Sequence, residues 1–357
     1  MPRGYSSAAL PLIAVLIGLA AASAAQTVVA PLAAALLIVA LIWPVQAWGE
    51  SYLPRYLALI VSVIVIVASF AAFGSLAAWA FGRVTRWIVA EAGRFQSVYT
   101  QMTEWLEGHG IAIAGIWAEH FNASWLLRTL QGVTGRLNAT LSFWLIVFVY
   151  VVLLLLEVRD FERRAHNLRN EQLGRLLVEG TQQAALKLRR YMLVRTQMSL
   201  ATGLLVWGFA KAIGLQFAAE WGVIAFVLNY IPFIGPFFAT TFPTLFASAQ
   251  FETWYPVLGL FLGLNLVQFV VGSYIEPRVA GSALSISPSL ILLSVFLWAS
   301  LWGPFGAFIG VPISIVALTF CALHPSSQWI ADLLGNAQHD GAPGKAMAQS
   351  LPPDHAN

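Results

Sequence analysis

The sequence predicts an all-α polytopic membrane protein with about eight transmembrane helices, two of them broken by Gly and Pro, and with amphipathic helical arms. Of its 357 residues, 59% are hydrophobic and 10% are charged, whereas roughly 25% are charged in an ordinary soluble domain. The mean hydropathy is +0.76. So few charged side chains could not cover a soluble globule, which excludes a soluble enzyme and a disordered chain. Cys321 is the only cysteine, which excludes an intrachain disulfide scaffold.

Long stretches without charge locate the membrane spans. No Asp, Glu, Lys or Arg occurs in residues 4–49, 56–82, 137–156, 196–210, 221–251, 253–275 and 279–331. A spanning helix needs about 20 mostly apolar residues, because it rises 1.5 Å per residue across about 30 Å of hydrocarbon. We therefore expect spans near 8–28, 31–48, 56–80, 138–156, 196–213, 218–248 and 254–275. The last stretch should hold at least one more span, broken by prolines.

The spans divide the chain into six segments. Residues 1–82 hold the first three transmembrane helices, 83–136 an extracytoplasmic helical segment, 137–156 the fourth helix, 157–195 a basic cytoplasmic amphipathic arm, 196–323 helices five to eight, and 324–357 a partly disordered cytoplasmic tail.

The first apolar run, with Arg3 before it and Ala22–Ala25 after it, also imitates a cleavable signal peptide. A second apolar run follows without a polar start, which favours a retained helix.

Basic residues set the expected orientation. The segment 157–195 carries nine Lys and Arg against five acids, so it should be cytoplasmic. Eight crossings then place both termini in the cytoplasm. Two interpretations of this arm stay open. Its arginines could meet anionic lipid headgroups, or the arm could pack on another segment or on a second subunit of a homo-oligomer. Nucleic-acid binding is not expected, because acids interleave the basic residues.

The sequence contains no recognisable catalytic motif. The six histidines are scattered, with no pair at metal-ligand spacing. A Walker A loop and a Gly-x-Ser-x-Gly elbow are both absent. We therefore expect no enzyme activity, no catalytic residue, no metal and no cofactor.

Two apolar segments contain irregular backbone signals. Asn229, Tyr230, Pro232, Gly235 and Pro236 lie within one charge-free stretch, where two prolines must interrupt helical hydrogen bonding. Gly303 and Gly306, near Pro304 and Pro312, repeat the pattern about 70 residues later. Such paired breaks indicate a transporter's central site, and we expect Asn229 and the carbonyls freed by Pro232 and Pro236 to face the transport path. The alternative is that these residues only kink the spans and ease their packing.

The seventh span carries a polar face. At about 100° per residue, Asn265, Gln268, Gly272 and Glu276 fall within an arc of about 80° on a helix that is otherwise apolar. Polar side chains inside a membrane usually face protein or a water-filled cavity. We expect this face to contact the broken segments. Asn265 and Gln268 should bind solute, and Glu276 should form the mouth of the solute site or carry a coupled proton. The alternative is interhelical hydrogen bonding, with Glu276 paired to Arg278 or reaching the headgroups.

The same segments carry a family resemblance. The run 229–236, the run Glu276–Gly281 with Leu284 and Ser287–Pro288, and the residues Gly303, Gly306, Gly310 and Pro312 resemble the signature stretches of the autoinducer-2 exporter (AI-2E) family of bacterial permease-like transporters. The resemblance is specific over about 185–320 and extends over 1–182 only in hydropathy. It implies a secondary transporter of the bacterial inner membrane. Export of autoinducer-2 and sodium or lithium/proton antiport are both attributed to the family.

Three functions are therefore weighed. The first is ion-gradient-driven export of a small polar organic solute such as autoinducer-2, without a cofactor. The second is a sodium or lithium/proton antiporter, for which Glu276 and Glu220 are the nearest acids. The third is a membrane scaffold that transports nothing. The candidate substrate-binding residues are Asn229, Tyr230, Pro232, Gly235, Pro236, Asn265, Gln268, Glu276, Gly303 and Gly306.

Overall fold

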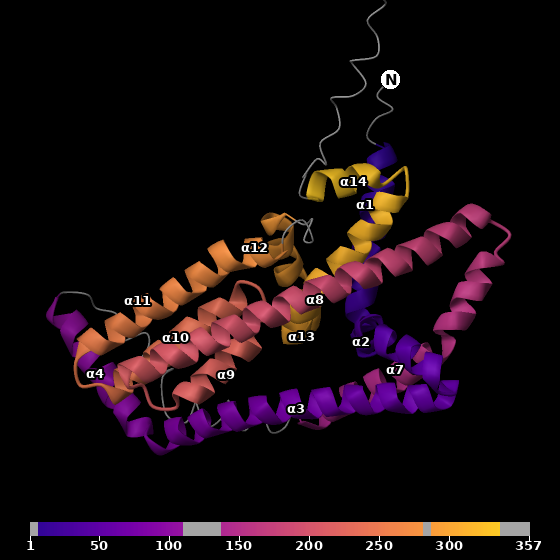
Figure 1. Cartoon of the computed structure of the whole chain (residues 1–357). Coiled ribbons are helices and arrows are strands. Elements are labelled where there is room, and N and C mark those ends of the chain that lie inside the picture. Colours follow the sequence, from indigo (N-terminus) through magenta and orange to yellow (C-terminus); the bar gives the residue numbers. More distant parts are fainter. Residues whose placement is uncertain (1–5, 110–136, 281–286, 336–357) are drawn as a thin grey trace, which may run out of the picture.

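The computed structural model describes residues 6–109, 137–280 and 287–335, and every regular element in these ranges is a helix (Figure 1). The elements are α1 (Ser6–Ala24), α2 (Gln26–Tyr52), α3 (Arg55–Ala90), α4 (Ala92–Gly108), α7 (Leu137–His166), α8 (Glu171–Ile213), α9 (Ala218–Leu228), α10 (Ile234–Gln250), α11 (Trp254–Val270), the π-helical turn η1 (Val271–Ile275), α12 (Glu276–Ala280), α13 (Pro288–Leu323) and α14 (Gln328–Leu334). Residues 110–136 of the expected extracytoplasmic segment, motif residues Gly281 and Leu284, and the tail beyond 335 lie outside the described residues.

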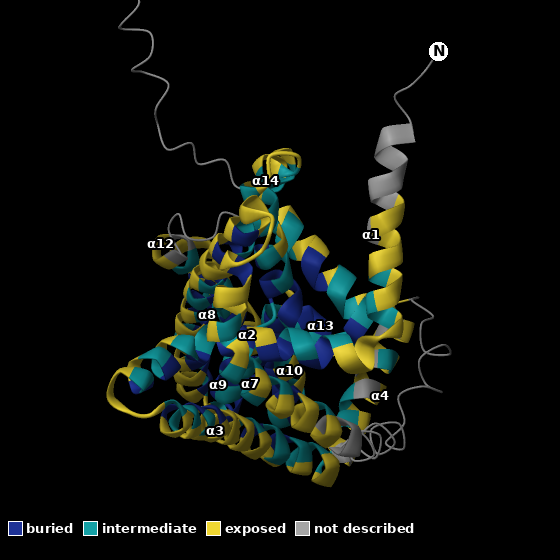
Figure 2. Ribbon diagram, turned by 90° about the vertical axis from the view of Figure 1, so that its right-hand side faces the viewer, coloured by how far each residue is buried: buried dark blue, intermediate teal, exposed yellow. Residues whose placement is uncertain are grey.

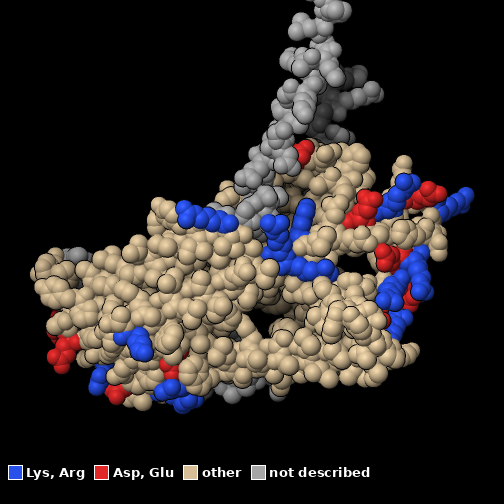
Figure 3. Space-filling view, viewed as in Figure 1, with Lys and Arg blue, Asp and Glu red and all other residues tan. Residues whose placement is uncertain are grey.

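The helices confirm the predicted fold class, an all-α polytopic membrane protein. Five are long and apolar enough to cross a membrane: Gln26–Tyr52, Arg55–Ala90, Leu141–His166, Trp254–Ile275 and Pro288–Leu323. Buried residues lie in the centre, where α13, α9 and α10 are surrounded by α2, α3, α7 and α8 (Figure 2). Figure 3 shows charged side chains gathered around the α7–α8 turn and near the α3–α4 end, with a smaller basic group between them and broad uncharged surface elsewhere.

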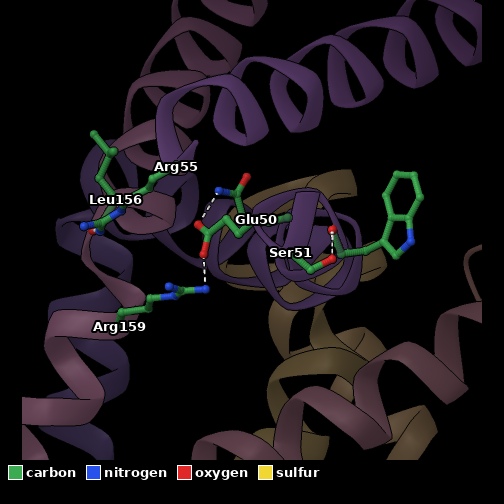
Figure 4. A network of polar contacts seen from close by, with 7 residues as sticks. Glu50, Ser51, Arg55, Leu156 and Arg159 are labelled. Carbon is green, nitrogen blue, oxygen red and sulfur yellow. Dashed lines mark hydrogen bonds and ion pairs between the residues drawn. The ribbon is translucent and has the colours of Figure 1, made fainter. Parts of the chain in front are cut away.

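A buried polar network joins α2, α3 and α7 (Figure 4). Glu50, near the end of α2, forms an ion pair with Arg159 of α7 and accepts a hydrogen bond from Gln46 Nε2 at 2.7 Å. Arg55, the first residue of α3, donates to the carbonyl oxygen of Leu156 on α7. The Glu50 side chain is only 4% exposed, so its charge requires a close partner. The network therefore fixes the α2–α3 turn against α7.

The helix α8 crosses the boundary that the sequence places between the arm and the fifth span. It is one continuous helix of 43 residues. It begins where the side chain of Asn170 accepts a hydrogen bond from Leu173 N, and it ends at Gly214, whose φ of 80° suits glycine. On its arm side, Arg189 Nε donates to Ala40 O of α2 at 2.6 Å. This arginine therefore binds protein, as the packing interpretation of the arm expects.

The segment 218–248, expected as one span, is a helical hairpin of α9 and α10. Rings of Phe217 and Phe246, at the start of α9 and toward the end of α10, are 5.9 Å apart between centroids. Gln250 joins the base of the hairpin by accepting from Gln216 N at 2.8 Å and donating to Gly214 O at 2.9 Å. With 11 residues, α9 rises only about 16 Å, which is too short to cross the hydrocarbon.

The helix α13 also folds back on itself. Its backbone leaves the helical conformation at Trp302 and Gly303, where Gly303 has φ 65° and ψ −148°. The hydroxyl oxygens of Ser294 and Ser314 are 2.6 Å apart, although a straight helix would separate these residues by about 30 Å. The interruption predicted at Gly303–Gly306 is therefore the turn of a second helical hairpin. Pro288–Leu323, counted above by its length and composition, is thus not one straight span.

Glycines allow the hairpin arms to approach each other. A Cβ on Gly306 would collide with the carbonyl oxygen of Trp298, and one on Gly235 with that of Leu228. A Cβ on Gly203 of α8 would lie 2.8 Å from the carbonyl oxygen of Gly222 of α9. Replacing Gly235 by Leu therefore disrupts the hairpin itself, and a loss of function in that variant would not identify a solute site.

We predict that Gly306→Ala lowers the thermal stability of the purified protein, because the methyl group meets backbone that cannot move aside. Overpacking of this kind costs about 1–3 kcal/mol. The control is Gly259→Ala on α11, where no atom lies within 4 Å of the added Cβ and helix propensity favours alanine. Thermal unfolding followed by tryptophan fluorescence measures both. Equal melting temperatures for the two variants would contradict the packing described here.

Candidate functional site

The turn of the first hairpin satisfies its own backbone. Proline at 232 and 236 removes the amides that would bond the carbonyls of Leu228 and Pro232 in a helix. Leu228 O instead accepts from Ile231 N at 3.0 Å, and Pro232 O accepts from Ile234 N at 2.7 Å. The carbonyls that the prolines free therefore have partners within the turn. Their exposure to a transport path stays a prediction.

Two side chains of this turn reach α8. Asn229 is 5% exposed, and its amide donates to Ser199 Oγ at 3.4 Å. Tyr230 OH donates to Thr196 Oγ1 at 3.0 Å. The Tyr230 ring contacts Phe73 of α3 and lies 6.4 Å from Phe308 of α13, measured between ring centroids. The first turn therefore lies where α3, α8 and the second hairpin meet.

The second turn packs on other helices. Trp302 Nε1 donates to Ala22 O of α1 at 3.0 Å, and the ring of Phe305 is 4.9 Å from that of Phe143 on α7. Ile231 and Ile234 of the first hairpin pack on the core that α13 shares with α2 and α7. The two broken segments are therefore neighbours, as expected. Within them, Gly303 supplies the positive φ of the turn and Gly306 the close approach of the arms.

The residues of the expected polar face of the seventh span differ in exposure and in their partners. Asn265 is exposed, and its amide donates to Phe261 O of its own helix at 2.7 Å. Gln268 is half-buried, while Leu264 and Val271 form the buried side. The turn Val271–Ile275 is a π-helix, whose i→i+5 bonds rotate successive side chains by less than 100°. The smaller rotation moves Glu276 toward the angular position of Gln268, so the four residues still share one side of the span. Among the described residues, Asn265 forms no hydrogen bond to the broken segments.

Glu276 forms an ion pair with Arg195 of α8, not with Arg278. The distance from Arg195 Nη1 to Glu276 Oε1 is 3.1 Å, and the side chains are 8% and 31% exposed. A buried guanidinium needs such a partner. This pair fixes the junction of η1 and α12 to α8.

Sequence reasoning missed the part of the site that α8 provides. The residues Tyr191, Arg195, Ser199 and Thr202 recur at spacings of four, four and three, and each is at most 6% exposed. At 3.6 residues per turn they occupy one face. The spacing was visible in the sequence, but the boundary drawn at 195 divided it between an arm and a span. We call these four residues the α8 polar face.

Glu220 is also paired with an arginine. Its side chain, 4% exposed, lies 2.5 Å from Arg83 Nη1 of α3, and the Arg83 guanidinium sits over the ring of Phe217 at 5.4 Å. Glu220 and Glu276, the two acids considered for cation exchange, therefore each have a cationic partner. Within the part of the chain that is described, no group of three His, Cys, Asp or Glu side chains could hold a metal ion.

Two adjacent helical hairpins with broken turns, packed against a long helix with buried polar residues, define the architecture of a polytopic membrane transporter. Comparison with known proteins agrees. The chain belongs to the AI-2E family of transporters, whose sequence profile matches residues 12–324.

Relatives in two bacteria illustrate the similarity. The AI-2 transport protein TqsA of Escherichia coli K12 is 28% identical over 319 residues, which cover 87% of this chain and 90% of TqsA. YhhT of the same organism is 32% identical over 204 residues, 57% of each chain. A relative from Borreliella burgdorferi is 30% identical over 179 residues, 49% of each chain.

We predict that Glu276→Gln destabilises the protein, because it leaves the buried Arg195 charge unpaired. Removing one partner of a buried pair costs about 3–5 kcal/mol, and partial exposure of Glu276 should reduce this to roughly 1–3 kcal/mol. Thermal unfolding measures the change. The matched control is Glu171→Gln, which breaks an exposed pair with Arg175 and should cost about 0–0.5 kcal/mol. Equal effects of the two substitutions would show that the Arg195 pair contributes no more than a surface contact.

Proposed function

We propose that this protein is a secondary transporter of the bacterial inner membrane that exports a small polar organic solute such as autoinducer-2, driven by an ion gradient. The observation that carries the proposal is the meeting of the first broken turn with α8, where Asn229 and Tyr230 bond to Ser199 and Thr196. Polar groups in an apolar span are expensive and mark solute pathways. Membership of the AI-2E family, and the name of TqsA as an AI-2 transport protein, support the same function.

The ion pairs favour export of an organic solute over cation/proton antiport. An antiporter needs a carboxylate that alternates between a proton and a cation. The carboxylates of Glu220 and Glu276 are each held by an arginine, and a fixed cation beside a carboxylate repels Na⁺ or Li⁺. A scaffold that transports nothing gives no reason to bury Asn229 beside Ser199, since apolar packing would serve as well.

We propose further that both termini are cytoplasmic. A helical hairpin returns the chain to the side from which it came. If neither hairpin counts as a crossing, the eight expected spans become six, and an even number keeps the termini on one side. The basic segment 157–195 then remains cytoplasmic, as its excess of Lys and Arg requires.

Flux measurements test the transport function. Inside-out vesicles that contain the protein should accumulate autoinducer-2 when an ion gradient is imposed, and should not exchange Na⁺ or Li⁺ for protons. Asn229→Leu should lower autoinducer-2 flux severalfold, because it removes the buried amide that bonds to Ser199.

The matched control is Asn265→Leu, because Asn265 is exposed and its amide bonds only within α11. This variant should transport like the unmodified protein, and membrane levels of both variants should be measured. Cation/proton exchange without autoinducer-2 accumulation would refute the export proposal in favour of the antiporter. Equal flux in the two asparagine variants would refute the role of Asn229.

Reporter fusions test the orientation. A reporter fused after residue 170, in the turn between α7 and α8, should be active on the cytoplasmic side, because basic residues flank this turn. The control is a fusion after Gly108, at the end of α4, which should report the opposite side. Reversed signals from the two fusions would overturn the topology.

A further inference from the structure

At three of its four residues, the α8 polar face has a buried polar atom without a hydrogen-bond partner among the described residues. The hydroxyl groups of Tyr191 and Thr202 and the Nε atom of Arg195 are buried, with no partner among the described residues. The fourth residue, Ser199, accepts only a long hydrogen bond, 3.4 Å from Asn229 Nδ2 to Ser199 Oγ. Three unpartnered groups therefore lie along one side of one helix.

Such a face is expensive in an apolar surrounding. A buried polar group without a partner loses its bonds to water and gains none in return, and lipid offers no substitute for water. Tyr191 and Arg195 are about one turn apart on α8. Apolar side chains would stabilise the same packing better, so the unpartnered groups need another explanation.

The position of the α8 polar face in the fold indicates contact with the transported solute. The broken turn of the first hairpin touches it through Asn229, and Glu276 reaches it from the junction of η1 and α12. Gly203, next to Thr202, allows α9 to pack closely on α8. The face therefore lies between α8 and two irregular segments, which is where transporters place their solutes.

We propose that the α8 polar face is the wall of the solute site, and that the solute it fits is neutral and rich in hydroxyl groups. This inference rests on the proposed transport function and adds the binding residues and the class of solute. Tyr191, Arg195, Ser199 and Thr202 supply hydrogen bonds as the solute passes the first hairpin.

The charges of the face select this class. Arg195 and Glu276 neutralise each other at 3.1 Å, and the other contributors are hydroxyl and amide groups. A free cation would meet the Arg195 guanidinium, and a free anion would meet the Glu276 carboxylate. A hydroxyl group both donates and accepts, so it can bond to the unpartnered Arg195 Nε, to Tyr191 OH and to the carboxylate of Glu276.

Cysteine labelling tests the wall directly. Cys321 is the only cysteine, so Cys321→Ser gives a background without thiols. Ser199→Cys and Thr202→Cys are small changes on the proposed wall. Ser62→Cys on α3 is the matched control, because Ser62 is equally buried and also unpartnered but lies on another helix. The probe is a small water-soluble methanethiosulfonate reagent applied to the full chain in inside-out vesicles.

We expect the reagent to label both α8 variants severalfold faster than Ser62→Cys, because a solute pathway admits water during the transport cycle. Ribitol, a neutral polyol, should slow labelling at Thr202→Cys, whereas sodium acetate at equal osmolality should not. Adding Tyr191→Phe, which removes only a hydroxyl group, should abolish the protection by ribitol. The substitution Tyr150→Phe on α7 should leave it intact.

The outcomes separate the wall, the solute class and the transport function. If the α8 variants are labelled no faster than Ser62→Cys, the wall is refuted. The unpartnered groups of the α8 polar face are then explained by bonds to buried water. Protection by acetate and not by ribitol would refute the solute class. If the vesicles also fail to accumulate autoinducer-2 while the labelling and the ribitol protection are as expected, the proposed solute is wrong and the wall stands.

Discussion

Inside a membrane, a backbone that leaves the helical conformation must find its hydrogen bonds within the protein, and this requirement governs the arrangement of the hairpins. At the first turn, Ile231 N and Ile234 N bond the carbonyls that the prolines leave free. At the second, Gly303 reverses the chain at a φ of 65° and Gly306 brings the arms together. Both turns are enclosed by other helices, so α2, α3, α7 and α8 serve as the surrounding that lipid cannot provide.

Charge obeys the same rule. Glu50, Glu220 and Glu276 lie on three different parts of the chain, and each is paired with an arginine from a neighbouring helix. Each pair joins elements that are distant in sequence. Removal of Arg159 or Arg83 would leave a buried carboxylate, and removal of Glu276 would leave the buried Arg195 guanidinium. Such pairs are strong constraints on geometry even where they add little net stability. The arrangement of the helices is therefore specified by a few ionic contacts as well as by apolar packing.

The sequence predicted the fold class and the two interruptions because both depend on local composition. Apolar length indicates spans, and the clustered prolines and glycines at 232–236 and 303–306 remove or weaken helical hydrogen bonds. It did not predict that each interruption reverses the chain, since that depends on contacts such as Ser294 with Ser314. It assumed uniform rotation along the seventh span, and so did not predict the π-helical turn at Val271–Ile275 or the ion pair of Glu276 with Arg195 of α8. It also divided the α8 polar face, because Arg195 was counted as part of a basic arm when its partner Glu276 lies 81 residues away.

The continuity of α8 has a mechanical consequence. A helix of 43 residues is a rod of about 65 Å, and the close approach of Gly203 and Gly222 attaches α9 to its far end. A displacement of the α7–α8 turn cannot be absorbed by a flexible linker within this rod. It is carried along α8 as tilt or translation to the first broken turn. The α7–α8 turn is highly charged. If lipid or protein binds there, the displacement of α8 would therefore also displace the first broken turn at the centre of the molecule.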